Sequence, residues 1–324
     1  MPRWTRGYAT GNEVQELELD AEMVEEADWE LPTRERGLWS DAFRALRRNR
    51  LAITALVLLL ILSALAVSTD FTHLVSRYSP YDQVYTHVHE GPSWSHFFGT
   101  DNLGRDNWSR VLTGIEISLQ IGIGTQIIVL IVGMAVGVGA ALGGRVSDNI
   151  LMRITDITYA FPDLLFIILL RSVLNGRDWP VLGEPRLQVM LAIAMVNWVT
   201  IARLVRGQML SLAERDYVMA ARTLGASNWR IATRHMLPNT LGPVIVAFAF
   251  GIPIAIFAEA ALGFLGLGLP PPTASLGRLV SDGYVYIQVN PWIVAFPAGA
   301  IALLMLCFTF LGDGLRDALD PRQR

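Results

Sequence analysis

Six long apolar segments constrain the fold of this chain more than any other feature of its sequence. The first, LAITALVLLLILSALAV (51–67), is about long enough to cross the hydrocarbon core of a bilayer as a helix. Five similar segments follow, at about 115–142, 154–174, 187–204, 241–262 and 291–311. Charged residues make up only 17% of the chain, against about 25% in soluble domains. The sequence therefore predicts an all-α, polytopic membrane protein with six transmembrane helices.

The distribution of arginine predicts how these helices are oriented. All 26 basic residues are Arg, and four of them, Arg44, Arg47, Arg48 and Arg50, precede the first apolar segment. Six more lie between Arg203 and Arg234, at the end of the fourth segment and along the connector 207–239. Because cytoplasmic loops carry an excess of basic residues, we expect both termini and this connector to lie in the cytoplasm. The protein would be a multi-pass protein of the cell membrane. Three residues that flank an outer loop depart from the rule: Arg171, Arg177 and Arg186.

The N-terminal stretch differs in charge from the rest of the chain. Ten of the 29 acidic residues lie before residue 36, with few apolar side chains among them. Such a composition favours a disordered tail. We divide the chain into this cytoplasmic tail (1–36), an amphipathic lead-in with the first span and an outer segment (37–113), a core domain with five spans and the connector (114–315), and a C-terminal tail (316–324). The mildly basic body follows from the orientation of the spans and needs no nucleic-acid partner.

Small residues of the second span and Pro162 in the third span indicate how the helices pack. Gly133 and Gly137 are four residues apart, as are Gly139 and Gly143, and this spacing lets helix backbones approach closely. Pro162 lies inside the predicted third span and frees a backbone carbonyl there.

The connector contains a segment, YVMAARTLGASNWRIATRHMLPN (217–239), with the pattern of a folded element. We expect a helix from Tyr217 to Leu224, ended by Gly225 in the left-handed conformation. Ser227 can cap a second helix, Asn228 to Met236, which Pro238 would stop. Two short helices that meet at a glycine would form a rigid protrusion for another protein to bind. The alternative is an amphipathic loop that lies on lipid.

This segment resembles the EAA loop of ABC importer permeases, written E-A-A-x3-G-x9-I-x-L-P. Five motif positions are in register: Ala220, Ala221, Gly225, Leu237 and Pro238. Met219 replaces the acidic residue and His235 replaces the Ile. Further blocks resemble the second, C-type permease of the dipeptide/oligopeptide/nickel branch: FGTDNLGRDNWSRVLTGIEISL (98–119), AFPDLLF (160–166), ARLVRGQMLSLAERDYVMAARTLGAS (202–227), EAALGFLGLGLPPPTASLG (259–277) and GDGLRDALDP (312–321).

The resemblance implies an ABC importer type I permease fold and a set of partners. These would be a homologous second permease, two ABC ATPase subunits and an extracytoplasmic solute-binding protein, assembled in a lipid membrane. It also implies that the connector is a coupling helix that contacts the ATPase through Tyr217, Met219, Ala220, Ala221, Arg222, Gly225, Ala226, Leu237 and Pro238. ATP and Mg²⁺ would be held by the ATPase subunits, and no cofactor by this chain. In agreement, a phosphate-binding G-x-x-x-x-G-K-[ST] loop is impossible in a chain without Lys.

Few other polar residues suggest chemistry, and we predict no catalytic residue. Glu116 and Glu259 lie near span ends, where interfacial or helix-capping roles are expected. In the 98–110 block we expect a structured outer turn in which Arg105 pairs with Asp101 or Asp106; a contact with the binding protein is the alternative. Four histidines in the outer segment are interpreted as solvated: His73, His87, His89 and His96. The alternative is a metal site with His87 and His89 on one strand face.

Two other functions are alternatives to that of a permease subunit. A stand-alone secondary transporter or channel would need ionisable pairs at membrane depth. An intramembrane enzyme would need a catalytic constellation there, and the sequence contains neither pattern. Under the resemblance, the solute is left open among dipeptides, oligopeptides, nickel chelates and oligosaccharides, with peptides favoured.

Overall fold

A computed structural model describes residues 38–71, 75–174 and 183–319 of the chain. The predicted acidic tail, His73 and Arg177 lie outside the described residues. The chain divides into two compact units, Met1–Asp41 and Ala42–Arg324. In the first unit only the beginning of helix α2 (Leu38–Arg48) is described, and everything below concerns the second.

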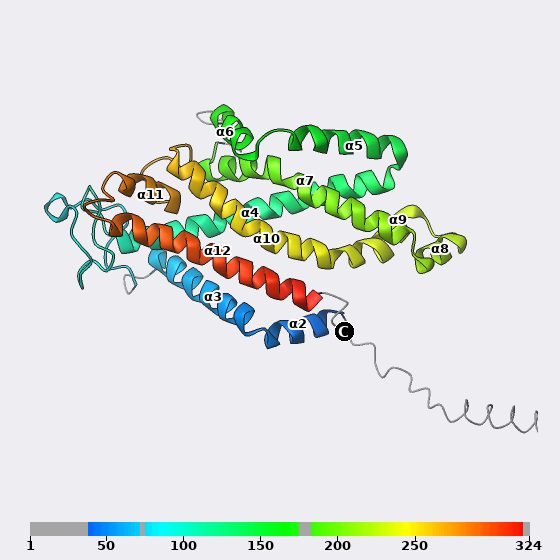
Figure 1. Ribbon diagram of the computed structural model, residues 1–324, viewed down its shortest axis with the longest axis horizontal. Helices are drawn as coiled ribbons and strands as arrows, with labels where there is room; N and C mark the ends of the chain where they lie inside the picture. Colours follow the sequence, from blue (N-terminus) through cyan, green and yellow to red (C-terminus); the bar gives the residue numbers. More distant parts are fainter. Residues whose placement is uncertain (1–37, 72–74, 175–182, 320–324) are drawn as a thin grey trace, which may run out of the picture. The chain divides into compact units, whose positions relative to one another are not determined.

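Helices make up almost all of the described structure (Figure 1), and its only β pairing is an isolated bridge between Thr100 and Asp106. After α2 the elements are α3 (Arg50–Phe71), a short 3-10 turn η1 (Tyr85–His87), α4 (Asn107–Leu142), α5 (Gly144–Tyr159), α6 (Asp163–Leu174), α7 (Pro185–Ala213), α8 (Asp216–Thr223), α9 (Asn228–Ile231), a π turn η2 (Ala232–Met236), α10 (Leu237–Phe264), α11 (Leu276–Tyr284) and α12 (Trp292–Leu319). The predicted all-α fold is confirmed.

Five of the six predicted spans appear as continuous helices long and apolar enough to cross a membrane. They are α3, α4, α7, the run Asn228–Phe264 that contains α10, and α12. The helix α4 begins eight residues before the predicted start at Ile115, because Asp106 caps it by accepting a hydrogen bond from the backbone N–H of Ser109. The outer segment that was predicted at the end of the region 37–113 therefore ends inside a helix.

The predicted third span, 154–174, is wrong as a single helix. The structure has two helices there, α5 and α6, which meet at an angle of 92° around Pro162. Proline disfavours the helical conformation of the residue before it and cannot donate a backbone hydrogen bond. The pair counts as one further crossing only if both arms are taken together.

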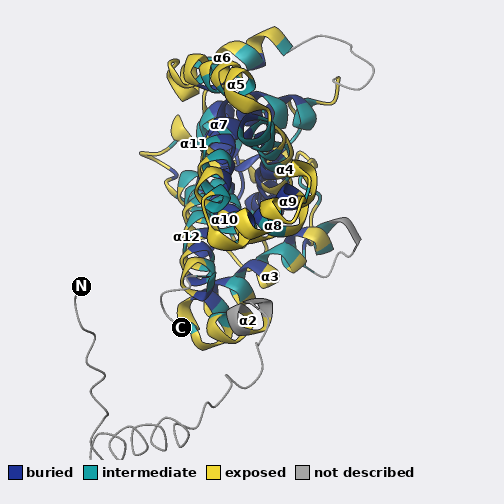
Figure 2. Cartoon of the chain, turned by 90° about the vertical axis from the view of Figure 1, so that its right-hand side faces the viewer, coloured by how far each residue is buried: buried dark blue, intermediate teal, exposed yellow. Residues whose placement is uncertain are grey.

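The centre of the second unit is the contact between α4 and α7, which run side by side (Figures 1 and 2). A Cβ atom on Gly133 would lie 2.6 Å from Cβ of Ile201, and one on Gly137 would lie 2.7 Å from the carbonyl oxygen of Ala202. These two glycines therefore allow the close packing that their spacing predicts. The pair Gly139 and Gly143 does not contact α7 in this way.

At one end of the bundle, residues 75–106 and α11 gather over the N-terminus of α4 (Figure 1). The helix α11 was not predicted. It packs so closely on α10 that a Cβ on Gly277 would lie 2.2 Å from the carbonyl oxygen of Ala260. Arg171 of α6, a departure from the basic-residue rule, is buried there and donates to the carbonyl oxygens of Leu267 and Gly268 at 3.1 Å. It therefore fixes the α10–α11 connection.

Candidate functional site

The opposite end of the bundle carries the connector, and its first turn has a specific backbone geometry. The N–H of Ala226 donates to the carbonyl of Ala221 at 3.1 Å, and the N–H of Gly225 donates to that of Arg222 at 3.0 Å. This is the Schellman pattern of helix ends, in which Gly225 has the positive φ of 83° that it requires. The predicted glycine end of the first helix is confirmed.

The second helix of the connector begins as predicted but does not end as predicted. The Ser227 hydroxyl caps α9 by accepting from the N–H of Arg230 at 3.3 Å. Pro238 does not stop the helix; it lies in the first turn of α10, after the π turn η2. In that turn the N–H of Leu237 donates to the carbonyl of Ala232, five residues earlier. The wider π turn makes room for a ring that would otherwise clash with the preceding turn.

Buried apolar side chains anchor the connector to the bundle. Val218 of α8, Ile231 of α9 and Met236 of η2 are buried in one cluster with Val205 and Met209 of α7. Because each short helix contributes at least one fully buried side chain, α8, the turn and α9 are held against α7 as one body.

Two arginines of α7 pair with acidic residues of α5, next to the connector. Arg206 forms a bidentate ion pair with Asp148. In one of its two contacts, Arg206 Nη2 lies 2.6 Å from Asp148 Oδ2. Arg203 Nη2 lies 2.9 Å from Asp156 Oδ1. A bidentate arginine–carboxylate pair fixes direction as well as distance, so α5 is tied to the helix that carries the connector.

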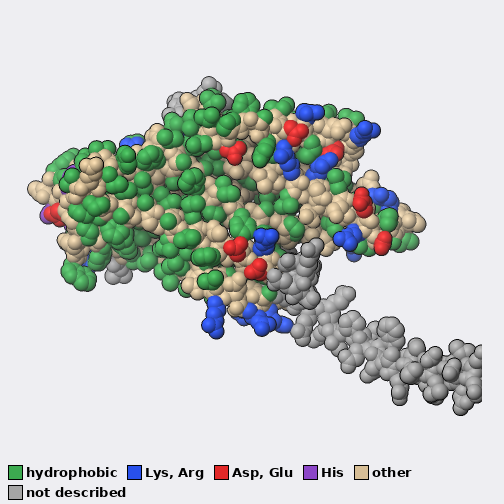
Figure 3. Space-filling model, in the orientation of Figure 1, with side chains coloured by type: hydrophobic (Ala, Val, Ile, Leu, Met, Phe, Trp, Pro, Cys, Tyr) green, Lys and Arg blue, Asp and Glu red, His purple; other side chains and the backbone are tan. Residues whose placement is uncertain are grey.

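The outer surface of the connector combines apolar and cationic side chains. Trp229 is 67% exposed and Leu224 is 87% exposed, and Tyr217 and Met219 are also exposed. Arg222, Arg230 and Arg234 are exposed beside them. Figure 3 shows that charged side chains gather at this end of the face in view, whereas hydrophobic ones cover most of the rest. Exposed aromatic residues with arginine are typical of protein-binding surfaces.

The structure places the nine predicted contact residues in two groups. Exposed on the connector are Tyr217, Met219, Ala220, Arg222, Gly225 and Pro238, and half-buried against the α7 cluster are Ala221, Ala226 and Leu237. Sequence reasoning did not single out Leu224 and Trp229, the two most exposed large apolar side chains of the segment. A Trp and a Leu flanked by polar residues in an Arg-rich connector are the signal that could have identified them.

At the other end, the 98–110 block is a structured turn, as predicted. Arg105 Nε lies 2.7 Å from Asp101 Oδ2, and the same carboxylate accepts from the buried Arg110. Arg110 also faces Asp282 of α11 at 3.7 Å. Asp106 serves α4 as its cap instead of pairing with Arg105.

The helix-capping role considered for two glutamates is wrong. Glu116 lies inside α4, where it accepts from Gln120 at 2.7 Å. Glu259 is fully buried inside α10 and accepts from the hydroxyl of Ser118 at 3.1 Å. Neither residue is at a helix end, because both helices extend beyond the predicted span limits.

The predicted solvated state of the outer histidines is wrong for His96, which is buried. His87 and His89 do not share a strand face, since His87 ends a 3-10 turn and His89 has a positive φ of 58°. The ring of His89 lies against that of Tyr286 instead.

Two protein families match this sequence. Residues 129–324 match the family described as "Binding-protein-dependent transport system inner membrane component". Residues 37–92 match the "N-terminal TM domain of oligopeptide transport permease C".

Curated relatives match over most of their length. The oligopeptide transport system permease protein OppC of Bacillus subtilis is 39% identical over 89% of this chain and 90% of that protein. The dipeptide transport system permease protein DppC of the same organism is 43% identical over 88% of this chain and 86% of that protein. Among solved structures, an inward-facing MetNI methionine ABC transporter matches 65% of this chain and 96% of that chain, with a TM-score of 0.54 and 18% identity. This last likeness concerns the fold.

Proposed function

The chain belongs to the family of binding-protein-dependent transport system inner membrane components, and from this premise we propose that it is the C-type permease subunit of an ATP-driven peptide importer. The family excludes the two rival functions, a stand-alone transporter and an intramembrane enzyme. Solute choice is proposed from the oligopeptide and dipeptide permeases that this sequence resembles.

The proposed contact with the ATPase is the exposed surface of α8 and α9. The observation that carries it is the combination of a rigid anchor and an unpartnered apolar surface: Val218 and Ile231 are buried beneath the turn, while Leu224 and Trp229 project from it. A mobile loop would absorb a displacement of its partner. A turn fixed by a Schellman motif and packed on α7 instead passes the displacement to the membrane helices as rigid-body motion.

The proposed assembly follows from the position of this contact surface at one end of the bundle. This chain would pair with a second permease to enclose the path of the solute. Two ATPase subunits, which hold ATP and Mg²⁺, would each contact one connector. The end formed by residues 75–106 and α11 would face the extracytoplasmic binding protein, with both chain termini and the connector in the cytoplasm.

Cysteine crosslinking tests the coupling contact. The chain has one Cys, Cys307, and its side chain is buried in α12, so an introduced exposed thiol can be addressed selectively. We compare Leu224→Cys on the connector with Trp94→Cys on the outer loop; these two side chains are 87% and 86% exposed, respectively. In the assembled complex, a short thiol-directed photocrosslinker on Leu224→Cys should yield an adduct with an ATPase subunit.

Trp94→Cys is the matched control and should give no ATPase adduct. In intact cells a membrane-impermeant maleimide should label Trp94→Cys, and Leu224→Cys only after permeabilisation. An ATPase adduct with Trp94→Cys, or none with Leu224→Cys, would contradict the proposed coupling surface.

A further inference from the structure

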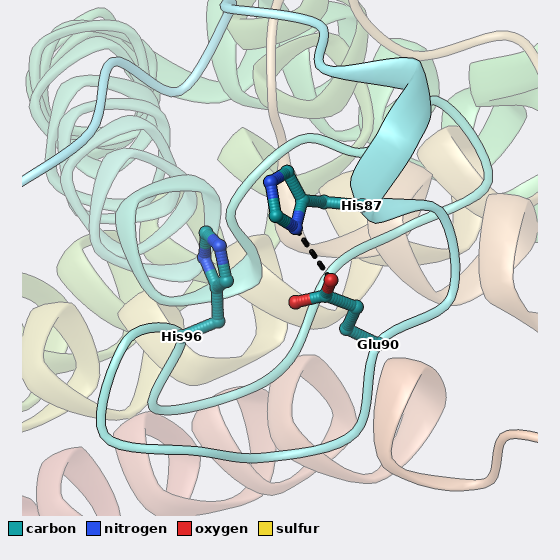
Figure 4. A group of neighbouring side chains, drawn as sticks. All are labelled: His87, Glu90 and His96. Atoms are coloured by element: carbon teal, nitrogen blue, oxygen red, sulfur yellow. Dashed lines mark hydrogen bonds and ion pairs between the residues drawn. The ribbon is translucent and has the colours of Figure 1, made fainter.

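A second cluster of side chains lies far from the connector, in the loop that precedes α4. We propose that His87, Glu90 and His96 bind one divalent transition-metal ion of the zinc class. One ligand atom from each of the three side chains lies within 4.8 Å of the other two. Figure 4 shows the imidazole of His96 facing the pair formed by His87 and Glu90.

His96 is held in the manner of a metal-ligating histidine. Its Nδ1 lies 2.9 Å from Asp106 Oδ1, and its side chain is buried. The other oxygen of Asp106 accepts from the N–H and the hydroxyl of Ser109 at 2.8 and 2.7 Å. The Asp106 carboxylate accepts each of these hydrogen bonds, so the proton of the neutral His96 ring lies on Nδ1. His96 Nε2 therefore keeps the lone pair that a metal ion needs. A carboxylate behind the imidazole is the usual second partner of metal-bound histidines.

His87 and Glu90 supply the two movable ligands. His87 Nδ1 and Glu90 Oε1 are 2.5 Å apart, and these side chains are 49% and 38% exposed. Tetrahedral zinc with bonds of about 2.0–2.1 Å needs ligand atoms about 3.3 Å apart. The half-exposed pair can open by about 1 Å around an ion, and its exposure gives the ion an entry path. The Glu90 carboxylate also offsets part of the ionic charge.

The backbone under these ligands is already fixed. The N–H of Glu90 donates to Thr100 Oγ1 at 2.9 Å, and the N–H of Thr100 donates to the carbonyl of Glu90 at 3.0 Å. The Thr100 hydroxyl donates in turn to the carbonyl of His87. Gly99, with φ of 70°, passes so close that a Cβ there would lie 2.4 Å from the Glu90 carbonyl oxygen. Little ordering of the chain is therefore left for the metal to accomplish.

The donor set determines the class of ion. Two imidazoles and one carboxylate suit Zn²⁺, Ni²⁺ or Cu²⁺, whereas Mg²⁺ and Ca²⁺ prefer oxygen ligands. Three protein ligands leave a fourth position for water or for a group from a docked protein. Bound metal would fasten the loop 87–100 to Asp106, the residue that caps the central helix α4.

Zinc titration of the full-length chain in lipid nanodiscs tests the site. The protein is purified through a tag without histidine, stripped with a chelator and titrated with ZnCl₂ against a fluorescent zinc indicator. We expect one zinc ion per chain, and at least ten-fold weaker binding in His87→Ala and in Glu90→Gln. His96 is left intact, because its buried ring packs on Tyr78 and its replacement could unfold the loop.

Two controls separate this site from non-specific binding. His235→Gln removes a histidine at the other end of the bundle and should bind zinc as the wild type does. Zinc should also slow amide hydrogen exchange of residues 87–100 in the wild type and not in His87→Ala. Equal zinc affinity in the wild type, His87→Ala and Glu90→Gln would overturn the proposal, as would full competition by equimolar Mg²⁺ or the absence of zinc binding.

Discussion

Gly225 permits a test that separates the shape of the connector from its contact with another protein. Its φ of 83° lies in the region that L-residues avoid, and an added Cβ would meet no atom of the described residues within 4 Å. The cost of a substitution therefore comes from the backbone alone, about 1–2 kcal/mol for an ordinary residue. That cost corresponds to a factor of about 5–30 in the population of the formed turn.

A series of three substitutions at Gly225 separates the backbone cost from the steric effect of a large side chain. Gly225→Asn should be close to wild type, because Asn tolerates the left-handed conformation. Gly225→Ala should weaken the turn by about 1–2 kcal/mol and leave ATPase binding detectable. Gly225→Trp has the same backbone cost, but its ring would project from the turn into the space that an ATPase must occupy. We expect this variant to lose ATPase assembly and uptake.

The assay measures three properties of each variant in nanodiscs or proteoliposomes. Co-elution with the ATPase subunits reports assembly, peptide uptake reports coupling, and thermal unfolding reports whether the membrane helices remain packed. All three variants should unfold within a few degrees of the wild type, since no described atom lies within 4 Å of the added Cβ. Normal assembly and normal transport by Gly225→Trp would refute the docking of an ATPase at this turn. Equal losses in Gly225→Ala and Gly225→Trp would assign the effect to backbone strain instead of docking.

Two further substitutions test the contact surface and the helix packing. Trp229→Ala should weaken ATPase binding by about 2 kcal/mol, the threshold typical of an interface hot spot. It should not lower thermal stability, because the side chain is 67% exposed. The control is Trp94→Ala at the other end of the bundle, where the side chain is 86% exposed; it should leave the ATPase affinity unchanged. Gly137→Ala should destabilise the protein by about 1–3 kcal/mol in a denaturation assay, because a Cβ there would lie 2.7 Å from the carbonyl oxygen of Ala202. Gly299→Ala in α12 is its control and should not destabilise, because a Cβ there would have no atom of the described structure within 4 Å. Equal stability of these two glycine variants would contradict the packing argument.

The local geometry of the connector could be predicted because neighbouring residues dictate it. Gly225 and Ser227 act on backbone groups within five positions of themselves, as the end of α8 and the start of α9. Pro238 was assigned the wrong effect by the same local reasoning. Whether a proline ends a helix depends on whether the preceding turn can widen, and the π turn 232–236 widens while its buried residues Ala232 and Met236 stay packed on the bundle.

The pattern of apolar residues predicted neither the bend at Pro162 nor the helix α11. A hydropathy pattern records how many residues avoid water, but not whether a helix continues through a proline. The segment 276–284 is short, and its position on α10 depends on the absence of side chains at Gly263 and Gly277, which lie close to the facing backbone.

The sequence by itself determined the class of the protein, the number of apolar segments, and the glycine turn and serine cap of the connector, because hydropathy, glycine conformation and helix capping act over a few residues. The tertiary structure decided which side chains converge. It exposed Leu224 and Trp229 above a buried anchor, and it brought His87, Glu90 and His96 together beside the cap of α4. These juxtapositions depend on loop paths and helix packing across the chain, which no local pattern encodes.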